Sequence, residues 1–311
     1  MEINERAITP LSHKIQLSPG IASSRDYAYC RSVMHKASQR YSFASKFLPW
    51  WKRRHVEALY AFLRVGDDRV DVSYSGFSSP EAAIDDWETL YHSAFERGDS
   101  AHPVMRAFLD TAIRFGIQKS VMAAYFRAMR DDLWITRFAT LDDLLRYIEG
   151  SAIPVGRAMT HILGVRSPFT LEDALPFADR LSIGMQLSNF LRDIDEDYKL
   201  GRIYLPLEDL DRFSVAENDI ARRKVTPHFV ELMEFEIDRT VNFYAGAIPG
   251  VRMLASGRWG VMSGLLIYRA ILDDIRRANY DIFQRKADIS TFDKIRLVGI
   301  SFWRVASNPS K

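Results

Sequence analysis

The 311-residue chain has a single cysteine, Cys30, which excludes an internal disulfide and favours a reducing compartment. Its seven histidines show no ligand spacing, and HExxH and CxxC motifs are absent, so a zinc site is not expected. The formal net charge of +2 gives no reason to expect a nucleic-acid partner. The N-terminus shows no secretory signal, and uncharged stretches fall far short of the ~20 residues of a membrane span. We therefore expect a cytoplasmic, soluble protein.

Helical periodicity dominates what is present, and Asn-Gly or Asp-Gly hairpin signals are absent. Hydrophobic residues make up 47% of the chain, enough for a large core, and no composition shift marks a linker between domains. The sequence predicts one all-α domain over residues 21–311, preceded by a tail over residues 1–20. The predicted helices cover residues 22–48, 52–73, 80–97, 102–115, 118–133, 141–164, 171–199, 226–246, 258–281 and 290–306.

The last of these helices mixes Ile295, Leu297, Phe302 and Trp303 with basic residues. Such a pattern is typical either of a helix that lies on a membrane surface or of a final helix that packs on the core. We favour packing on the core.

Two acidic clusters about 120 residues apart share one internal geometry. Asp67 and Asp71 stand four residues apart in the first, and Asp193 and Asp197 in the second. Residues four apart share one face of a helix, so each pair forms a double-carboxylate claw. A solvated helix face is the alternative interpretation of the first cluster taken alone. Opposed claws would hold divalent metal ions, and such ions bind diphosphate.

The second cluster is the more specific, because Gln186 and Asn189 extend its stripe of oxygen donors along the same helix face. Mg²⁺ prefers a few carboxylates together with phosphate oxygens and retained water. A capped, salt-bridged surface helix is the alternative interpretation. We favour a magnesium site.

At this point the chain resembles the squalene/phytoene synthase family, which joins two isoprenoid diphosphates head to head. The second cluster, continued through residues 201–206, resembles the family's second aspartate-rich signature at almost every position. The resemblance extends over about residues 25–300. Its other motifs are residues 59–71, the central Leu145-Arg146-Tyr147 with Ser151, Ala152 and Gly156, the segment 30–49, and residues 266–268 with 278–280.

The resemblance implies an isoprenoid synthase fold around one deep apolar cavity, and it assigns site residues. It implies metal binding by Asp67, Asp71, Asn189, Asp193 and Asp197, and catalytic roles for these aspartates with Tyr147, Arg64 and Arg192. It implies substrate contacts from Ser38, Tyr60, Gln186, Tyr204, Tyr268, Lys294 and either Arg285 or Lys286, of which we favour Lys286. Tyr41 joins the substrate-binding set as an aromatic face that can stabilise a carbocation, although core packing is the commoner role.

The implied activity is condensation of two geranylgeranyl diphosphates through a cyclopropylcarbinyl diphosphate to phytoene, a carotenoid precursor. The cofactor is Mg²⁺, with Mn²⁺ as an alternative, and NADPH is not expected. The alternative is a C15-using relative that makes dehydrosqualene, squalene or hydroxysqualene from farnesyl diphosphate. A remote alternative is a non-catalytic assembly factor of the same fold. We expect a monomer that contacts a membrane peripherally to release its lipid product.

Two departures from the family pattern carry structural expectations. Pro154 follows Ile153 where a small residue and a threonine are usual, and a proline there should kink the helix. Arg69 lies inside the first claw, two residues from both Asp67 and Asp71, so its side chain should point away from the metals.

Overall fold

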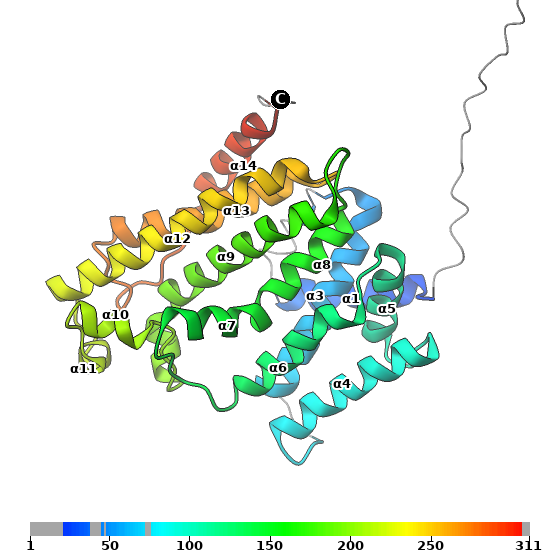
Figure 1. Ribbon diagram of the computed structural model, residues 1–311, viewed down its shortest axis with the longest axis horizontal. Helices are drawn as coiled ribbons and strands as arrows, with labels where there is room; N and C mark the ends of the chain where they lie inside the picture. The colour runs from blue at the N-terminus through cyan, green and yellow to red at the C-terminus, as the bar shows by residue number, and fades with distance from the viewer. Residues whose placement is uncertain (1–20, 38–44, 47, 72–75, 307–311) are drawn as a thin grey trace, which may run out of the picture.

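The protein is built from α-helices (Figure 1). The computed structural model describes residues 21–37, 45–46, 48–71 and 76–306. This part of the chain holds no β-strand, only an isolated bridge between Val165 and Leu254, so the predicted all-α class is confirmed. The helices are α1 (Ser24–Ala37), α3 (Trp50–Asp71), α4 (Pro80–Arg97), α5 (Pro103–Phe115), η1 (Lys119–Met122), α6 (Ala123–Asp131), α7 (Leu141–Ser151), α8 (Ile153–Leu163), α9 (Leu171–Lys199), α10 (Leu207–Arg212), α11 (Glu217–Ala221), α12 (Pro227–Met253), α13 (Arg258–Arg277) and α14 (Thr291–Ala306).

Three clusters of buried apolar side chains hold these helices together. The first joins α1, α3, α4, α5, α6 and α8 around Phe62, whose ring stacks on those of Trp87 and Phe108. The second joins α9, α12 and α13 with the segment after α13. The third is smaller and joins α7 and α9 through Tyr147 and Phe190. Apolar burial is the main favourable term in folding, so these clusters fix how the helices surround the space between them.

Helix α9 is the central element, because it contacts α7, α8, α12 and α13 (Figure 1). It begins with a capping box. The Thr170 hydroxyl accepts the Asp173 N–H, and the Asp173 carboxylate accepts the Thr170 N–H at 2.8 Å. The N-terminus of a long helix that carries the second acidic cluster is thereby fixed by two local hydrogen bonds.

Prolines act differently in two helices. The predicted helix 141–164 is interrupted at Ala152, and Pro154 stands in the first turn of α8, where its missing N–H removes no helical bond. The predicted end of helix 226–246 is wrong, because α12 continues through Pro249 to Met253. The continuation packs closely: a Cβ on Gly250 would lie 2.2 Å from the Phe177 Cβ. Tertiary packing against α9 thus outweighs the local effect of the proline.

Other differences from the predicted boundaries are local. Helix α1 ends at Ala37, and residues 38–44 of the predicted helix 22–48 lie outside the described residues, as does the predicted tail. The short helices α10 and α11 were not predicted, because they are too brief to show a periodic apolar pattern.

Helix α14 packs on α13, which confirms the favoured interpretation of the final helix. The Trp259 indole N–H donates to the Val298 carbonyl at 2.9 Å, and the hydroxyls of Ser263 and Ser301 lie 2.6 Å apart. Within the described residues, no helix is both long enough and apolar enough to cross a membrane.

Candidate active site

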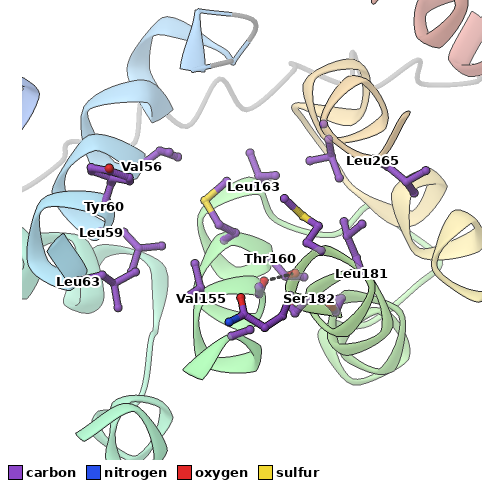
Figure 2. A pocket seen from close by; sticks show the side chains of 18 of the residues that line it. Val56, Leu59, Tyr60, Leu63, Val155, Thr160, Leu163, Leu181, Ser182 and Leu265 are labelled. Carbon is purple, nitrogen blue, oxygen red and sulfur yellow. Dashed lines mark hydrogen bonds between the residues drawn. The ribbon is translucent and has the colours of Figure 1, made fainter. Parts of the chain in front are cut away.

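A cavity of about 590 Å³ lies between the three clusters and is walled by α3, α6, α7, α8, α9, α12 and α13. Figure 2 shows Leu59 and Leu63 of α3 on one side, Leu181 of α9 and Leu265 of α13 on the other, and Val155 of α8 between them. Most of the lining is apolar. Such a wall favours a hydrocarbon ligand, and its few polar groups can orient that ligand.

Helix α3 contributes three polar side chains to the cavity wall. Tyr60, Arg64 and Asp67 follow one another at four and three residues, so they share one face of the helix, and all three line the cavity. Arg64 pairs with Asp68 at 2.6 Å, and the Tyr125 hydroxyl donates to Asp67 Oδ1 at 3.3 Å. The structure therefore brings three residues of the first predicted motif together.

Some predicted residues lie outside the described part of the structure. These are Ser38, Tyr41 and the side chain of Asp71, which is the last residue of α3. Arg69 turns toward α4, where it pairs with Asp86, so it points away from the cavity as expected.

Helix α9 faces the same cavity with the second motif. Gln186 and Asn189 line the wall, and Asp193 and Asp197 follow one and two turns later on the same helix face. The Arg192 guanidinium does not line the cavity. It instead donates two hydrogen bonds, of 2.8 and 2.6 Å, to the neighbouring Asp193 carboxylate.

The two aspartates of the second claw differ in how their charge is compensated. Burial raises the pKa of Asp193, but hydrogen bonds from Arg192 and from Lys286, whose Nζ lies 2.8 Å away, bring it below its ordinary value. Burial, and then the negative charge of Asp193, raise the pKa of Asp197 to about 7, against a smaller opposing effect of Arg202. Asp197 is therefore the carboxylate that lacks a full counter-charge.

The oxygen donors of α3 and α9 that lie on or next to the cavity wall suit a hard divalent cation. We call this part of the cavity its polar end. Asp67 and Asn189 line one wall each, and Asp193 and Asp197 continue the α9 stripe. The described side chains include no preformed group of three carboxylate, histidine or cysteine ligands. Mg²⁺ commonly binds through one or two carboxylates and completes its shell with substrate phosphates and water. The residues present fit a magnesium ion that is held jointly with a diphosphate.

Asp132, which was not predicted as a site residue, forms a polar network with two tyrosine hydroxyls. Asp132 lines the cavity and accepts hydrogen bonds from the Tyr147 hydroxyl at 2.7 Å and the Tyr204 hydroxyl at 3.4 Å. Burial, and then the charge of Asp132, raise the pKa of both phenols, so they stay protonated. The Tyr204 ring stacks on Phe190 with centroids 4.1 Å apart.

The sequence offered little signal for Asp132. It directly follows Asp131 but has no acidic partner at helical spacing, and its contacts with Tyr147 and Tyr204 join segments 15 and 72 residues apart. Proximity of this kind arises from packing and leaves no periodic pattern in the sequence.

The three basic residues predicted near the C-terminus pair with different acidic residues. Lys286 contacts Asp193, whereas Arg285 contacts Asp274 of α13 at 2.9 Å. Lys294 pairs with Asp288 at 3.4 Å. Tyr268 packs against the second core cluster and is not among the residues that line the cavity.

Comparison with known proteins agrees with this geometry. The family model of squalene/phytoene synthase matches residues 34–293. The chain is 33% identical to phytoene synthase from Arthrospira platensis over 286 residues, which cover 88% of this chain and 91% of that one. It is 32% identical to 15-cis-phytoene synthase from Synechocystis sp., covering 89% of this chain and 85% of the relative.

Solved structures match over most of the chain as well. A dehydrosqualene synthase in complex with ligand gives a TM-score of 0.81 at 28% identity, covering 91% of this chain and 98% of that one. A squalene synthase from Alicyclobacillus acidocaldarius gives a TM-score of 0.75 at 29% identity, covering 82% of this chain and 95% of that one.

Proposed function

The chain belongs to the squalene/phytoene synthase family of prenyltransferases and has the isoprenoid synthase fold, and from this premise we propose that it condenses two geranylgeranyl diphosphates to phytoene. The condensation joins the two prenyl chains head to head through a cyclopropylcarbinyl diphosphate. Both diphosphate groups leave, and a final proton loss gives the hydrocarbon. NADPH is not required, because no hydride is consumed.

One observation carries the proposal. Asp67 of α3 and Asn189 of α9 lie on the wall of one cavity whose lining is otherwise largely apolar. A prenyl diphosphate has the same two-part chemistry, an anionic head on a long hydrocarbon. The polar end suits the head, and the apolar wall suits the chain.

Charged side chains on the cavity wall and on the acidic stripe beside it act on the leaving group. Departure of diphosphate from an allylic carbon leaves negative charge on the phosphate oxygens, and preorganised cations stabilise that charge. We assign this role to Arg64, Arg192 and Lys286, because guanidinium and ammonium groups make strong charge-assisted hydrogen bonds to phosphate. Asp67, Asp71, Asn189, Asp193 and Asp197 would hold Mg²⁺, or Mn²⁺ in its place, which when bound supplies Lewis-acid stabilisation of the leaving diphosphate.

The carbocation that remains must be kept from water. Apolar side chains such as Leu59, Leu63 and Leu181 line the cavity and exclude solvent from the reacting carbons. Tyr60 and Tyr147 add aromatic rings to the wall, and Asp132 orients the Tyr147 hydroxyl. An aromatic face attracts a cation without offering it a strong nucleophile.

A second candidate uses farnesyl diphosphate. It is favoured by the similarity to a dehydrosqualene synthase and a squalene synthase, while the phytoene synthase relatives favour the C20 substrate. The two candidates share the same ionisation chemistry and differ in chain length and in the fate of the final cation.

Product identification separates these candidates. The purified chain is incubated with Mg²⁺ and either farnesyl or geranylgeranyl diphosphate, with and without NADPH. We expect phytoene from the C20 substrate, independent of NADPH, and diphosphate release that Asp67→Asn and Asp193→Asn each abolish while helical circular dichroism is retained. A C15-derived product in place of phytoene would select the second candidate. Absence of diphosphate release from either substrate would reject both.

A further inference from the structure

Three of the glycines that line the cavity differ in what an added side chain would meet. A Cβ on Gly156 would clash with the Ser182 hydroxyl, and one on Gly250 would clash with the Phe177 side chain. Glycine at these two positions lets neighbouring helices pack closely. A Cβ on Gly264 of α13 would meet no described atom within 4 Å. Position 264 therefore opens onto the empty space of the cavity.

The local structure gives no other reason for a glycine at this position. Gly264 lies inside α13 and has helical backbone, which every residue except proline adopts more readily than glycine does. Within the described residues, no neighbour approaches it closely enough to exclude a Cβ. What the glycine provides is free volume on the cavity wall.

The packing of α12 against α9 defines a depth in the cavity. Gly250 of α12 lies against Phe177 of α9, and Tyr244 of α12 lies against Gly184, so the two helices run antiparallel. Ala247 stands midway between Gly250 and Tyr244 and lines the cavity. Its level on α9 is therefore midway between Phe177 and Gly184.

Helix α13 brings Gly264 to the same depth. It follows α12 after only residues 254–257 and contacts it, so it runs back alongside α12 (Figure 1). Gly264 and Ala247 are equally far in sequence from the middle of this connection, and both line the cavity. The α9 residue at this level is Leu181, which Figure 2 shows on the same side of the cavity as Leu265, the neighbour of Gly264.

Gly264 thus stands partway along the cavity. On α9, Asn189 at the polar end lies eight residues beyond Leu181, or about 12 Å along the helix axis. Ala174 also lines the cavity and lies seven residues before Leu181, or about 10 Å in the other direction. A ligand whose anionic head lies near Asn189 must pass the level of Gly264 to reach the far part of the cavity near Ala174.

We propose that Gly264 sets the length of hydrocarbon that the cavity accepts, because it leaves the passage from the polar end to the far part open. A side chain at this position would occupy the passage. The chain of geranylgeranyl diphosphate is one isoprene unit longer than that of farnesyl diphosphate, so an obstruction at this depth excludes the longer chain first. The identity of these ligands rests on the proposed function, whereas the open passage at Gly264 does not.

Binding of unreactive analogues tests the passage without turnover. The probes are saturated C15 and C20 alkyl diphosphates, which lack the allylic double bond and so cannot ionise to an allylic cation. Isothermal titration calorimetry with Mg²⁺ measures their Kd values. We expect Gly264→Leu to raise the Kd of the C20 probe about tenfold more than that of the C15 probe, the discrimination that an apolar pocket shows for a misfitting hydrocarbon group.

Gly299→Leu is the matched control. Gly299 also lies inside a helix, α14, and an added Cβ would meet no described atom within 4 Å, but this glycine does not line the cavity. Its substitution should leave both Kd values within about twofold, as is usual for surface positions. Gly264→Ala adds only one methyl group and favours the helix, so it should fold even if Gly264→Leu does not, and it should shift the ratio of the two Kd values in the same direction by about threefold.

Three binding results would overturn the proposal. The first is a ratio of C20 to C15 Kd values that stays unchanged in the Gly264 variants that fold, as circular dichroism reports. The second is an equal shift of that ratio in Gly299→Leu. The third is exclusion of the C20 probe by the unchanged chain, which would mean that the passage is closed.

Turnover separates this inference from the proposed function. With the two prenyl diphosphates and Mg²⁺, Gly264→Leu should lower diphosphate release from the C20 substrate more than from the C15 substrate. If the unchanged chain binds both probes yet releases no diphosphate from either substrate, the proposed function fails, while a length-dependent effect of Gly264→Leu on binding still supports the passage. If the unchanged chain binds neither probe, both proposals are rejected.

Discussion

At the scale of single residues, two basic side chains that are adjacent in the sequence have different partners in the structure. Lys286 contacts Asp193 of the acidic stripe, while its neighbour Arg285 contacts Asp274, which also pairs with Arg277. Under the proposed function, Lys286 and not Arg285 would exchange a carboxylate for a phosphate when a substrate binds.

We predict that Lys286→Ala lowers kcat/KM for the prenyl diphosphate about tenfold to hundredfold, the loss expected for one charge-assisted hydrogen bond. Arg285→Ala is the control, and it should leave kcat/KM within about twofold because Arg285 pairs with Asp274 and makes no contact with the acidic stripe. Steady-state diphosphate release at several substrate concentrations measures both. Equal losses in the two variants would contradict the assignment.

A second residue-scale prediction concerns a buried acid outside the cavity. One guanidinium, that of Arg239, serves both Glu236 and Asp209 at 2.8 and 2.7 Å. Burial raises the pKa of Glu236 from 4.5 to about 8, against an opposing effect of Arg239. Between these values the folded state keeps a proton that the unfolded chain releases, so the free energy of unfolding falls as pH rises.

Glu236→Gln should remove this slope, which amounts to at most about 1.4 kcal/mol per pH unit. Denaturant unfolding across the pH range from 4.5 to 8 measures it. Glu234→Gln on the same helix is the control, because an Arg276 hydrogen bond lowers the pKa of Glu234 below its ordinary 4.5, so through most of that range it is charged in both the folded and the unfolded state. A slope that survives in Glu236→Gln would show that another group binds the proton.

At the scale of elements, the ends of the helices matter because they fix where the side chains in the middle point. Helix α9 delivers Gln186, Asn189, Asp193 and Asp197 along one face, and its start is set by Thr170. The helix is held by α8 and α12 as well as by its own cap. A defect in the cap should therefore reduce stability more than it disturbs the site.

We predict that Thr170→Ala lowers the free energy of unfolding by about 1 kcal/mol, because the N–H of Asp173 loses its hydroxyl acceptor. Thr170→Ser keeps the hydroxyl and should restore most of the loss. Denaturant unfolding measures both, and kcat/KM should change by less than about twofold in either variant. A large activity loss that serine restores would mean that the cap also positions the acidic stripe.

At the scale of the whole molecule, the cavity exists because three separate clusters of apolar side chains hold helices around it. Helices α3 and α9 belong mainly to different clusters, yet both contribute oxygen donors to the lining of the same cavity. A ligand that bridges the two helices should therefore stabilise the entire fold.

We predict that Mg²⁺ with inorganic diphosphate raises the Tm by a few degrees, while diphosphate alone raises it less. A chelator should stop diphosphate release from the substrate, and added Mg²⁺ should restore it. Asp193→Asn serves as the control that loses the Tm shift without losing the fold. Release that continues after thorough chelation would contradict metal-assisted ionisation.

Much of the fold and part of the site could be predicted from the sequence. Helical periodicity and missing hairpin signals were enough for the all-α class, because both are local properties. The spacing of Gln186 and Asn189 placed them on one helix face, and the resemblance assigned Tyr60, Arg64 and Asp67 to the site. The structure puts both sets on the cavity wall. Family resemblance added the partnership between the two motifs.

Only the tertiary structure decided the remaining features, because they depend on contacts between segments distant in the chain. In the folded protein Asp132 accepts hydrogen bonds from Tyr147 and Tyr204, and Asp193 pairs with Lys286 and not with Arg285. Tertiary packing also carried α12 past its proline and left one face of α14 uncovered. Local patterns state which face of a helix is apolar, but the packing of whole helices determines what that face meets.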